Sequence, residues 1–370
     1  MSSILGLKRI VVVLAALLAI SAVVAGCGDD DDDGGSGGGG GATIALLLPE
    51  NQTPRYESAD RPYFEEKMEQ ICPDCNILYS NAAEDASKQQ SQVEAALTQG
   101  ADVLVLDPVD AASAAASVEK ARQQDVPVLS YDRLILGADV DVYVSFDNER
   151  VGELQGESLA GKLKEDGSPK GPIVMLSGDP ADSNAALFKK GAQSIFEADG
   201  VAVAKEYDTP GWLASNAQNE MQQSITALGK DGFAGVYAAN DDLGGGAIAA
   251  MKSAGIDPEE RPTTGQDATV AGVQRILVGQ QYMTVYKAIK PQASISAEIA
   301  LDLAEGEEVP QDKITDELDN EKEKVPSILL NPVAVTKDNI KGTVIADEFI
   351  TPEELCTGPY TQACKEAGIS

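Results

Sequence analysis

The chain has 370 residues, of which 60 are acidic and 28 basic, so that its formal net charge is −32, and it contains no histidine. This length exceeds one typical domain and suits two. The negative charge argues against a nucleic-acid partner, because phosphates would repel it. The lack of histidine removes the commonest general base and metal ligand, and we expect neither a metal site nor a cofactor.

An export signal is expected at the start of the chain. Lys8 and Arg9 precede an apolar run over residues 10–20 that continues through residues 22–24, and this run is short for a membrane span of about 20 apolar residues. The run ends in the tetrapeptide VAGC at residues 24–27. This tetrapeptide resembles a bacterial lipobox, and the resemblance implies that Cys27 carries a lipid after cleavage. An ordinary signal with a chance cysteine is the alternative.

A flexible tether is expected between the signal and the folded part. Residues 29–33 are all Asp, and a Gly/Ser-rich run follows up to residue 41. Such a composition cannot bury a core. We therefore expect residues 1–26 to be a signal peptide and residues 27–42 to be the lipidated cysteine with its tether.

Four further cysteines are expected to form disulfides. Cys72 and Cys75 form a C-x-x-C motif, and Cys356 and Cys364 lie near the end of the sequence. In an exported protein, paired cysteines indicate disulfides first. A redox C-x-x-C would begin a helix after a strand, whereas this motif lies between a helical pattern and a strand. Compartment and proximity predict the bridges 72–75 and 356–364.

Short apolar strands alternate with amphipathic helices through most of the chain. Strands are expected at residues 43–48, 76–80, 103–106, 126–130, 142–145, 173–176, 201–207, 234–238, in a strand ending at 265–266, and at 283–286 and 327–330. Helices are expected at residues 63–69, 87–99, 111–124, 149–163, 184–197, 215–227, 243–253, 269–277 and 292–304. This alternation is typical of parallel sheets with right-handed crossovers. Two such series, joined by a crossing near residues 145–148, predict two lobes that face a cleft.

Polar motifs follow the ends of these strands and support a family resemblance. They are YDR at 131–133, SFDNE at 145–149, VGELQ at 151–155, DSNA at 182–185, GWL at 211–213, AND at 239–241, GQDA at 265–268 and TVYK at 284–287. In this order they resemble the sugar-binding proteins of bacterial ABC transporters, in the ribose and xylose class, and most closely those that bind D-xylose. The resemblance covers nearly all of residues 43–350.

The resemblance implies an α/β fold of two Rossmann-like lobes, with parallel sheets joined by a three-strand hinge, which is the type I periplasmic binding protein fold. The N-terminal lobe would combine residues 43–147 with 287–330. The C-terminal lobe would combine residues 148–286 with 331–350. The acidic tail, residues 351–370, has no assigned place.

A sugar site needs fixed hydrogen-bonding groups, ideally charged, and flat aromatic faces. The positions that match the family's binding residues are Arg55, Tyr56, Asp132, Arg133, Asp182, Asn184, Trp212, Asn240, Asp267 and Lys287. Tyr56 and Trp212 are expected to cover the two ring faces, with Tyr56 standing where xylose-binding relatives usually carry Trp. For Asp182, Asn240 and Asp267 the alternative is a plain helix N-cap. Trp212 could also be a core residue and Arg133 a surface charge.

The function implied is capture and delivery of a sugar. The protein would be a monomeric lipoprotein at the outer face of the cytoplasmic membrane or in the periplasm, held to the membrane through its lipid alone. It would close its lobes around a monosaccharide, most of all D-xylose, and deliver it to an ABC permease. Ribose or glucose as the ligand, and presentation to a chemoreceptor, are the alternatives.

Two other classes are disfavoured. A glycoside hydrolase needs a carboxylic acid of raised pKa, and Asp182 and Asp267 are the candidates. Three cations, Arg55, Arg133 and Lys287, are expected to lower their pKa values, so no enzyme activity is expected. A sugar-responsive repressor would carry a DNA-binding helix-turn-helix where this chain has its signal and tether.

Overall fold

The computed structural model describes residues 41–369. The predicted signal peptide, Cys27 and residues 28–40 of the predicted tether lie outside the described residues. None of the helices within residues 41–369 is long and apolar enough to cross a membrane.

A seven-stranded sheet forms the first part of the fold. Its strand order is β10-β11-β5-β4-β3-β1-β2. The strands are β1 (Thr43–Leu48), β2 (Asn76–Asn81), β3 (Val103–Leu106), β4 (Val128–Tyr131), β5 (Val142–Phe146), β10 (Asp316–Asp319) and β11 (Lys324–Leu330). All neighbours are parallel except β10 and β11. The antiparallel strand β10 was not expected, because its sequence, DELD, lacks an apolar pattern.

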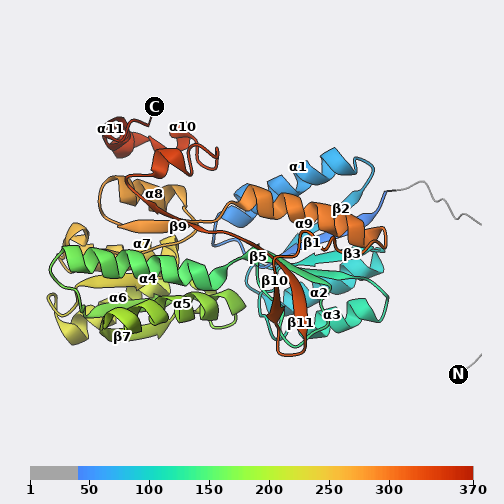
Figure 1. Ribbon diagram of the computed structural model, residues 1–370, viewed down its shortest axis with the longest axis horizontal. Helices are drawn as coiled ribbons and strands as arrows, with labels where there is room; N and C mark the ends of the chain where they lie inside the picture. Colours follow the sequence, from blue (N-terminus) through green and yellow to red (C-terminus); the bar gives the residue numbers. More distant parts are fainter. Residues whose placement is uncertain (1–40, 370) are drawn as a thin grey trace, which may run out of the picture. The chain divides into compact units, whose positions relative to one another are not determined.

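Helices cover both faces of this sheet, which explains why its central strands are continuously apolar. Figure 1 shows α1 (Arg61–Ile71) and α9 (Ile289–Ala304) on one face, and α2 (Ala86–Thr98) and α3 (Ala115–Arg122) on the other. Alternate residues of β1 point to opposite cores: Leu46 packs in the cluster that includes Phe64 of α1. Leu47 packs in the cluster that includes Val93 of α2.

The second part of the fold contains two smaller sheets. The strands β6 (Ile173–Ser177), β7 (Val203–Asp208) and β8 (Gly235–Ala238) are parallel, in the order β7-β6-β8. The strands β9 (Met283–Tyr286) and β12 (Val333–Thr336) pair antiparallel. The prediction of a strand that ends at residues 265–266 is wrong, because this segment forms only a single bridge, between Thr263 and Val236. The chain then turns at Asp267 and Ala268, which both have positive φ.

Five helices surround these sheets: α4 (Asn148–Glu165), α5 (Ser183–Asp199), α6 (Ala214–Leu228), α7 (Asp241–Ser253) and α8 (Val270–Leu277). The backbones of α4 and α5 touch, because a Cβ on Gly152 would lie 1.9 Å from the carbonyl oxygen of Phe188. A Cβ on Gly191 would likewise lie 2.0 Å from that of Glu149. These glycines therefore allow the first half of α5 to pack closely against the start of α4.

We call the seven-stranded sheet with α1, α2, α3 and α9 the first lobe, and the two smaller sheets with α4 to α8 the second lobe. The chain passes between them after β5, after β9 and after β11. The predicted α/β class, with mainly parallel sheets, is confirmed. The predicted residue boundaries of the lobes as independent units stay a prediction.

The C-terminal tail packs on the second lobe. Its helices α10 (Pro352–Leu355) and α11 (Thr361–Glu366) bury Leu355 and Cys364 in a cluster with Val273 and Leu277 of α8. A disulfide joins Cys356 to Cys364, and another joins Cys72 to Cys75 at the end of α1. The tail and α8 thus share a small hydrophobic cluster, which the sequence pattern did not indicate.

Candidate functional site

A cavity lies between the two lobes, with about 290 Å³ of empty space including its mouth. Its lining residues are Thr53, Arg55, Tyr56, Asp132, Arg133, Asp182, Asn184, Phe188, Trp212, Asn240, Gln266, Asp267 and Lys287. All ten residues that the sequence assigned to the site are among them, and their role in binding stays a prediction.

Arg55 organises the first-lobe wall. It immediately precedes the π-helix η1 (Tyr56–Asp60), and Asp60 returns to bind its guanidinium, with Nε–Oδ2 at 3.1 Å. Its Nη2 donates to Asp132 Oδ2 at 2.7 Å, and its Nη1 lies 4.0 Å from Asp267 Oδ1 of the second lobe. Arg55 is only 4 % exposed. The carboxylates of Asp60 and Asp132, which are also buried, balance its charge.

The backbone of Asp132 joins the two lobes. Asp132 follows β4 with a positive φ of 57°, which turns its carbonyl oxygen toward the cavity end of the sheet. That oxygen accepts hydrogen bonds from Tyr143 Oη (2.8 Å), Ser145 Oγ (2.6 Å) and Asn184 Nδ2 (3.0 Å). Because Asn184 begins α5 of the second lobe, the last bond crosses between lobes.

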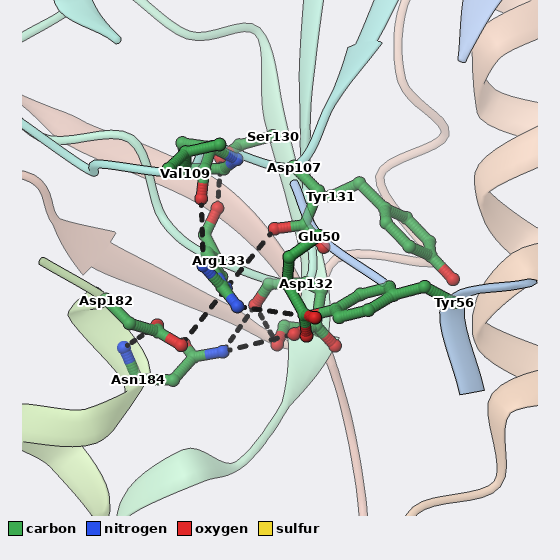
Figure 2. A network of polar contacts seen from close by, with 12 residues as sticks. Glu50, Tyr56, Asp107, Val109, Ser130, Tyr131, Asp132, Arg133, Asp182 and Asn184 are labelled. Atoms are coloured by element: carbon green, nitrogen blue, oxygen red, sulfur yellow. Dashed lines mark hydrogen bonds and ion pairs between the residues drawn. The ribbon is translucent and has the colours of Figure 1, made fainter. Parts of the chain in front are cut away.

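Arg133 also reaches the second lobe. Its Nε lies 3.0 Å from Asp182 Oδ2 and 3.6 Å from Asp107 Oδ1 of its own lobe. Figure 2 shows the guanidinium between these carboxylates, with the hydroxyl of Tyr56 beside it, at 3.4 Å from Nη2. Glu50 lies in the same network. The alternative of Arg133 as a surface charge is wrong, because it is 3 % exposed.

Two predicted site residues also cap helices. The side chain of Asp182 accepts from the backbone N–H of Asn184 and caps α5, and that of Asn240 accepts from the N–H of Leu243 and caps α7. Their capping geometry therefore holds them at the cavity. Asp267 is not a cap, since Thr269 caps α8.

Trp212 combines a core position with a place in the cavity wall. It ends the short helix η2 (Pro210–Trp212), and its Nε1 donates to Asp182 Oδ2 at 3.2 Å. A Cβ on Gly178 would lie 2.0 Å from the ring, so this glycine gives the indole its room. The edge of Phe188 meets the ring at a centroid distance of 6.4 Å.

Lys287 and Asp267 complete the second-lobe wall. Lys287 Nζ lies 3.6 Å from Asp267 Oδ1, and 5.7 Å from the ring centres of both Phe146 and Phe188. Aromatic faces at this distance attract a desolvated cation. Together these contacts keep the ammonium at the edge of the cavity.

Burial and charge oppose one another in the carboxylates of this site. Burial alone would raise the pKa of Asp132, but the charges of Arg55 and Lys287 outweigh it and lower that pKa well below its usual value. For Asp182, burial outweighs Arg133, and its pKa is raised. Burial likewise raises the pKa of Asp107 and of Glu50. The expectation that the cations lower every carboxylate pKa here is therefore wrong for Asp182, because desolvation is the larger effect.

Three lining residues were missed by the sequence reasoning. Phe188 lies one helical turn after Asn184 on α5, so helical spacing could have indicated it. Gln266 stands inside the GQDA motif, next to Asp267. Thr53 lies in the loop before η1 and gave no signal. Within residues 41–369, no group of three or more acidic or cysteine side chains is arranged to hold a metal ion.

Comparisons with known proteins agree on one family. The model of the periplasmic binding protein domain matches residues 44–308. The D-xylose-binding periplasmic protein of Escherichia coli is 39 % identical over 300 residues, which cover 80 % of this chain and 87 % of that protein. The multiple sugar-binding periplasmic receptor of Rhizobium radiobacter is 32 % identical over 290 residues, 74 % of this chain and 81 % of that protein.

Among solved structures, an ABC transporter solute-binding protein of Clostridium phytofermentans with bound β-D-glucose has a TM-score of 0.77. It is 27 % identical, and the match covers 85 % of this chain and 99 % of that one. These proteins are binding proteins and not enzymes.

Proposed function

Because the chain belongs to the periplasmic binding protein family, we propose that it captures a monosaccharide, most of all D-xylose, in the cavity between its lobes and delivers it to an ABC permease. Like these relatives, it is a binding protein and not an enzyme. The relative named for D-xylose and the structure holding β-D-glucose make these two sugars the first to test.

Charge balance in the cavity is the observation that carries this proposal. The three lining cations each lie beside a lining carboxylate: Arg55 beside Asp132 at 2.7 Å, Arg133 beside Asp182 at 3.0 Å, and Lys287 beside Asp267 at 3.6 Å. Among the lining residues, no cation is left without a carboxylate to attract an anionic ligand. Charged groups nonetheless make strong hydrogen bonds to hydroxyls. A small neutral polyol is therefore the ligand that this wall fits best.

Aromatic groups of the wall suit the C–H faces of a sugar ring. Trp212 and Phe188 reach the cavity from the second lobe, and Tyr56 reaches it from the first. We propose that Trp212 covers one ring face and Tyr56 the other. The hydroxyl of Tyr56 beside Arg133 would then also approach a ring hydroxyl.

Lobe closure is the proposed mechanism of capture. Contacts such as Asn184 with Asp132, and the N–H of Ala111 with the carbonyl of Ala181 at 3.0 Å, cross between the lobes. A sugar that touches both walls favours the closed form and shifts the population toward it. We further propose that the protein is a monomer, anchored at the outer face of the membrane by a lipid on Cys27.

Isothermal titration calorimetry with D-xylose, D-glucose and D-ribose tests the proposal. We expect saturable binding of at least one of these sugars, with D-xylose the tightest. Mass spectrometry of small molecules released from natively purified, denatured protein identifies the ligand without a prior choice. Absence of binding at millimolar concentrations of every sugar would contradict the proposal.

A further inference from the structure

The loop over residues 265–269 carries Gln266 and Asp267 of the cavity on a strained backbone. Asp267 has φ 86° and Ala268 has φ 48°, so two consecutive non-glycine residues are left-handed. This conformation is unfavourable for L-residues and persists only where surrounding contacts determine it. The contacts that fix this loop therefore decide where the Asp267 carboxylate lies.

Asp241, the first residue of α7, holds both ends of the strained pair. Its backbone N–H donates to the carbonyl of Gln266 at 3.0 Å. Its Oδ2 accepts from the backbone N–H of Thr269 at 2.8 Å and from the Thr269 hydroxyl at 3.1 Å. The middle of the loop binds to β9, through the carbonyl of Val285 and the hydroxyl of Thr284.

The second carboxylate oxygen of Asp241 is fixed by a closed ring of side chains. Oδ1 accepts from Gln281 Nε2 at 2.6 Å, and Gln281 Oε1 accepts from Arg275 Nε at 3.0 Å. Arg275 Nη2 in turn donates to the carbonyl of Asp241 at 2.5 Å. The carboxylate thus has a single orientation, set by donors from α8 and from the loop before β9.

Two glycines provide the space that the carboxylate of Asp241 occupies, because they have no side chain. A Cβ on Gly265 would lie 2.1 Å from Asp241 Oδ1, and a Cβ on Gly272 would lie 2.1 Å from Oδ2. Asp241 is fully buried and does not line the cavity. Its side chain therefore cannot touch a ligand, and any effect on binding must pass through its neighbours.

We propose that Asp241 is a positioning residue of the sugar site, which acts on the ligand through the strained loop and the carboxylate of Asp267. Asp267 Oδ1 lies 3.6 Å from Lys287 and 4.0 Å from Arg55, so a shift of the loop would weaken its contacts with both cations. This inference rests on the proposed function, because it concerns the affinity for the sugar.

A double-mutant cycle tests this route. The dissociation constant for D-xylose is measured for the wild type, Asp241→Asn, Asp267→Ala and the double variant. We expect Asp241→Asn to weaken binding about tenfold in the wild type, but less than twofold once Asp267 is already Ala. An equal loss in both backgrounds would overturn the proposal.

Asp242→Asn is the control for charge, because Asp242, the next residue of α7, interacts with Asp267 through its charge but has no side-chain hydrogen bond to the loop. We expect it to change the affinity less than twofold. A loss as large as that of Asp241→Asn would show that charge alone is responsible, and would also overturn the proposal.

A second measurement needs no ligand. It includes the variant Gln281→Met, so that the proposal can still be tested if Asp241→Asn does not fold. Hydrogen exchange of the amides at residues 266–269 should be faster in Asp241→Asn, and also in the milder Gln281→Met, than in the wild type. Unchanged exchange in the folded variants would contradict the inference. A wild type that binds no sugar contradicts the proposed function, whereas a wild type that binds and an Asp241→Asn variant that binds equally well contradict only the inference.

Discussion

The guanidinium of Arg133 and the carboxylate of Asp182 face each other from opposite lobes, with Nε 3.0 Å from Oδ2. Both residues are almost fully buried. The nearest carboxylate of the same lobe, Asp107, lies 3.6 Å from the same nitrogen and has no hydrogen-bond donor on either side-chain oxygen within residues 41–369. Arg133 thus lies between a carboxylate of the opposite lobe and a carboxylate of its own lobe.

Replacement of Arg133 is expected to weaken sugar binding. Arg133→Ala should raise the free energy of binding by about 1.5–3 kcal/mol, the range for hydrogen bonds to charged groups. Calorimetric titration with D-xylose measures the change. Arg150→Ala, which removes a partly exposed arginine that pairs with Glu153 and Glu157 on α4 and does not line the cavity, is the control. If Arg133→Ala binds as tightly as this control, Arg133 does not belong to the site.

Trp212 should report sugar binding by fluorescence. It is the only tryptophan of the chain, and its ring lies in the cavity wall. D-xylose, whose hydroxyls are all equatorial in the β-pyranose, should shift its emission saturably, and D-ribose, with an axial hydroxyl, much less. Trp212→Ala should cost at least about 1 kcal/mol of binding. Normal binding by Trp212→Ala, together with unchanged emission of the wild type at saturation, would place this residue in the core alone.

The melting temperature without ligand should rise as the pH falls from about 7 to about 5. Burial raises the pKa of Asp60 and of Asp241 from 3.8 to about 6. The folded chain therefore binds protons more tightly than the unfolded chain between these values, and each group contributes on the order of 3 kcal/mol that is present below pH 4 and lost as the pH rises through 6. Asp132, whose pKa is lowered, has the opposite effect only below its ordinary value.

Scanning calorimetry over this pH range measures the effect. Asp60→Asn removes one of the carboxylates whose pKa is raised, which also include Asp242 with a pKa of about 6 and Glu84 with a pKa of about 7, and it should reduce the dependence of the melting temperature on pH. A melting temperature that falls between pH 7 and pH 5 would contradict the assignment.

The disulfide of the tail should stabilise the second lobe without affecting the sugar. Cys356 and Cys364 close a loop with a sequence separation of 8, and loss of such a cross-link costs about 2–3 kcal/mol. The double Ser variant should melt at a lower temperature and bind D-xylose as the wild type does, because neither cysteine lines the cavity. A weakened affinity would mean that the packing of the tail on α8 reaches the strained loop before that helix.

Mass analysis of the membrane-extracted protein tests the lipid on Cys27. We expect a diacylglyceryl adduct on this residue and no trace of residues 1–26, because VAGC at residues 24–27 resembles a lipobox. Cys27→Ser should remain unmodified. An intact N-terminus in the wild type would contradict both the cleavage and the anchor.

The elements with strong periodicity could be predicted from the sequence. The apolar strand β3, VLVL, and the motif residues after β4, β6 and β8 were expected where the structure has them. Both lobes depend on such local signals, and site residues such as Asp132 and Arg133 after β4 and Asn240 after β8 follow from their places beyond the ends of strands. The family resemblance supplied which of the polar residues to choose.

Other features depend on contacts that no local pattern encodes. The burial of Leu355 and Cys364 against α8 joins segments about 80 residues apart. The balance that raises the pKa of Asp182 but lowers that of Asp132 depends on how deeply each is buried and on which cations lie nearby. Thr53 enters the cavity from an irregular loop, whose course is set by hydrogen bonds of Glu50 to the N–H groups of Gln52 and Thr53.

The burial of the cavity wall has a kinetic consequence. All thirteen lining residues are buried, so we expect a sugar held among them to be covered by both lobes. Its residence time is then the time that the lobes take to part, and not the lifetime of any single hydrogen bond. Contacts that cross between the lobes but never touch the sugar, such as that of Ala111 with Ala181, would lengthen residence as effectively as contacts with the ligand itself.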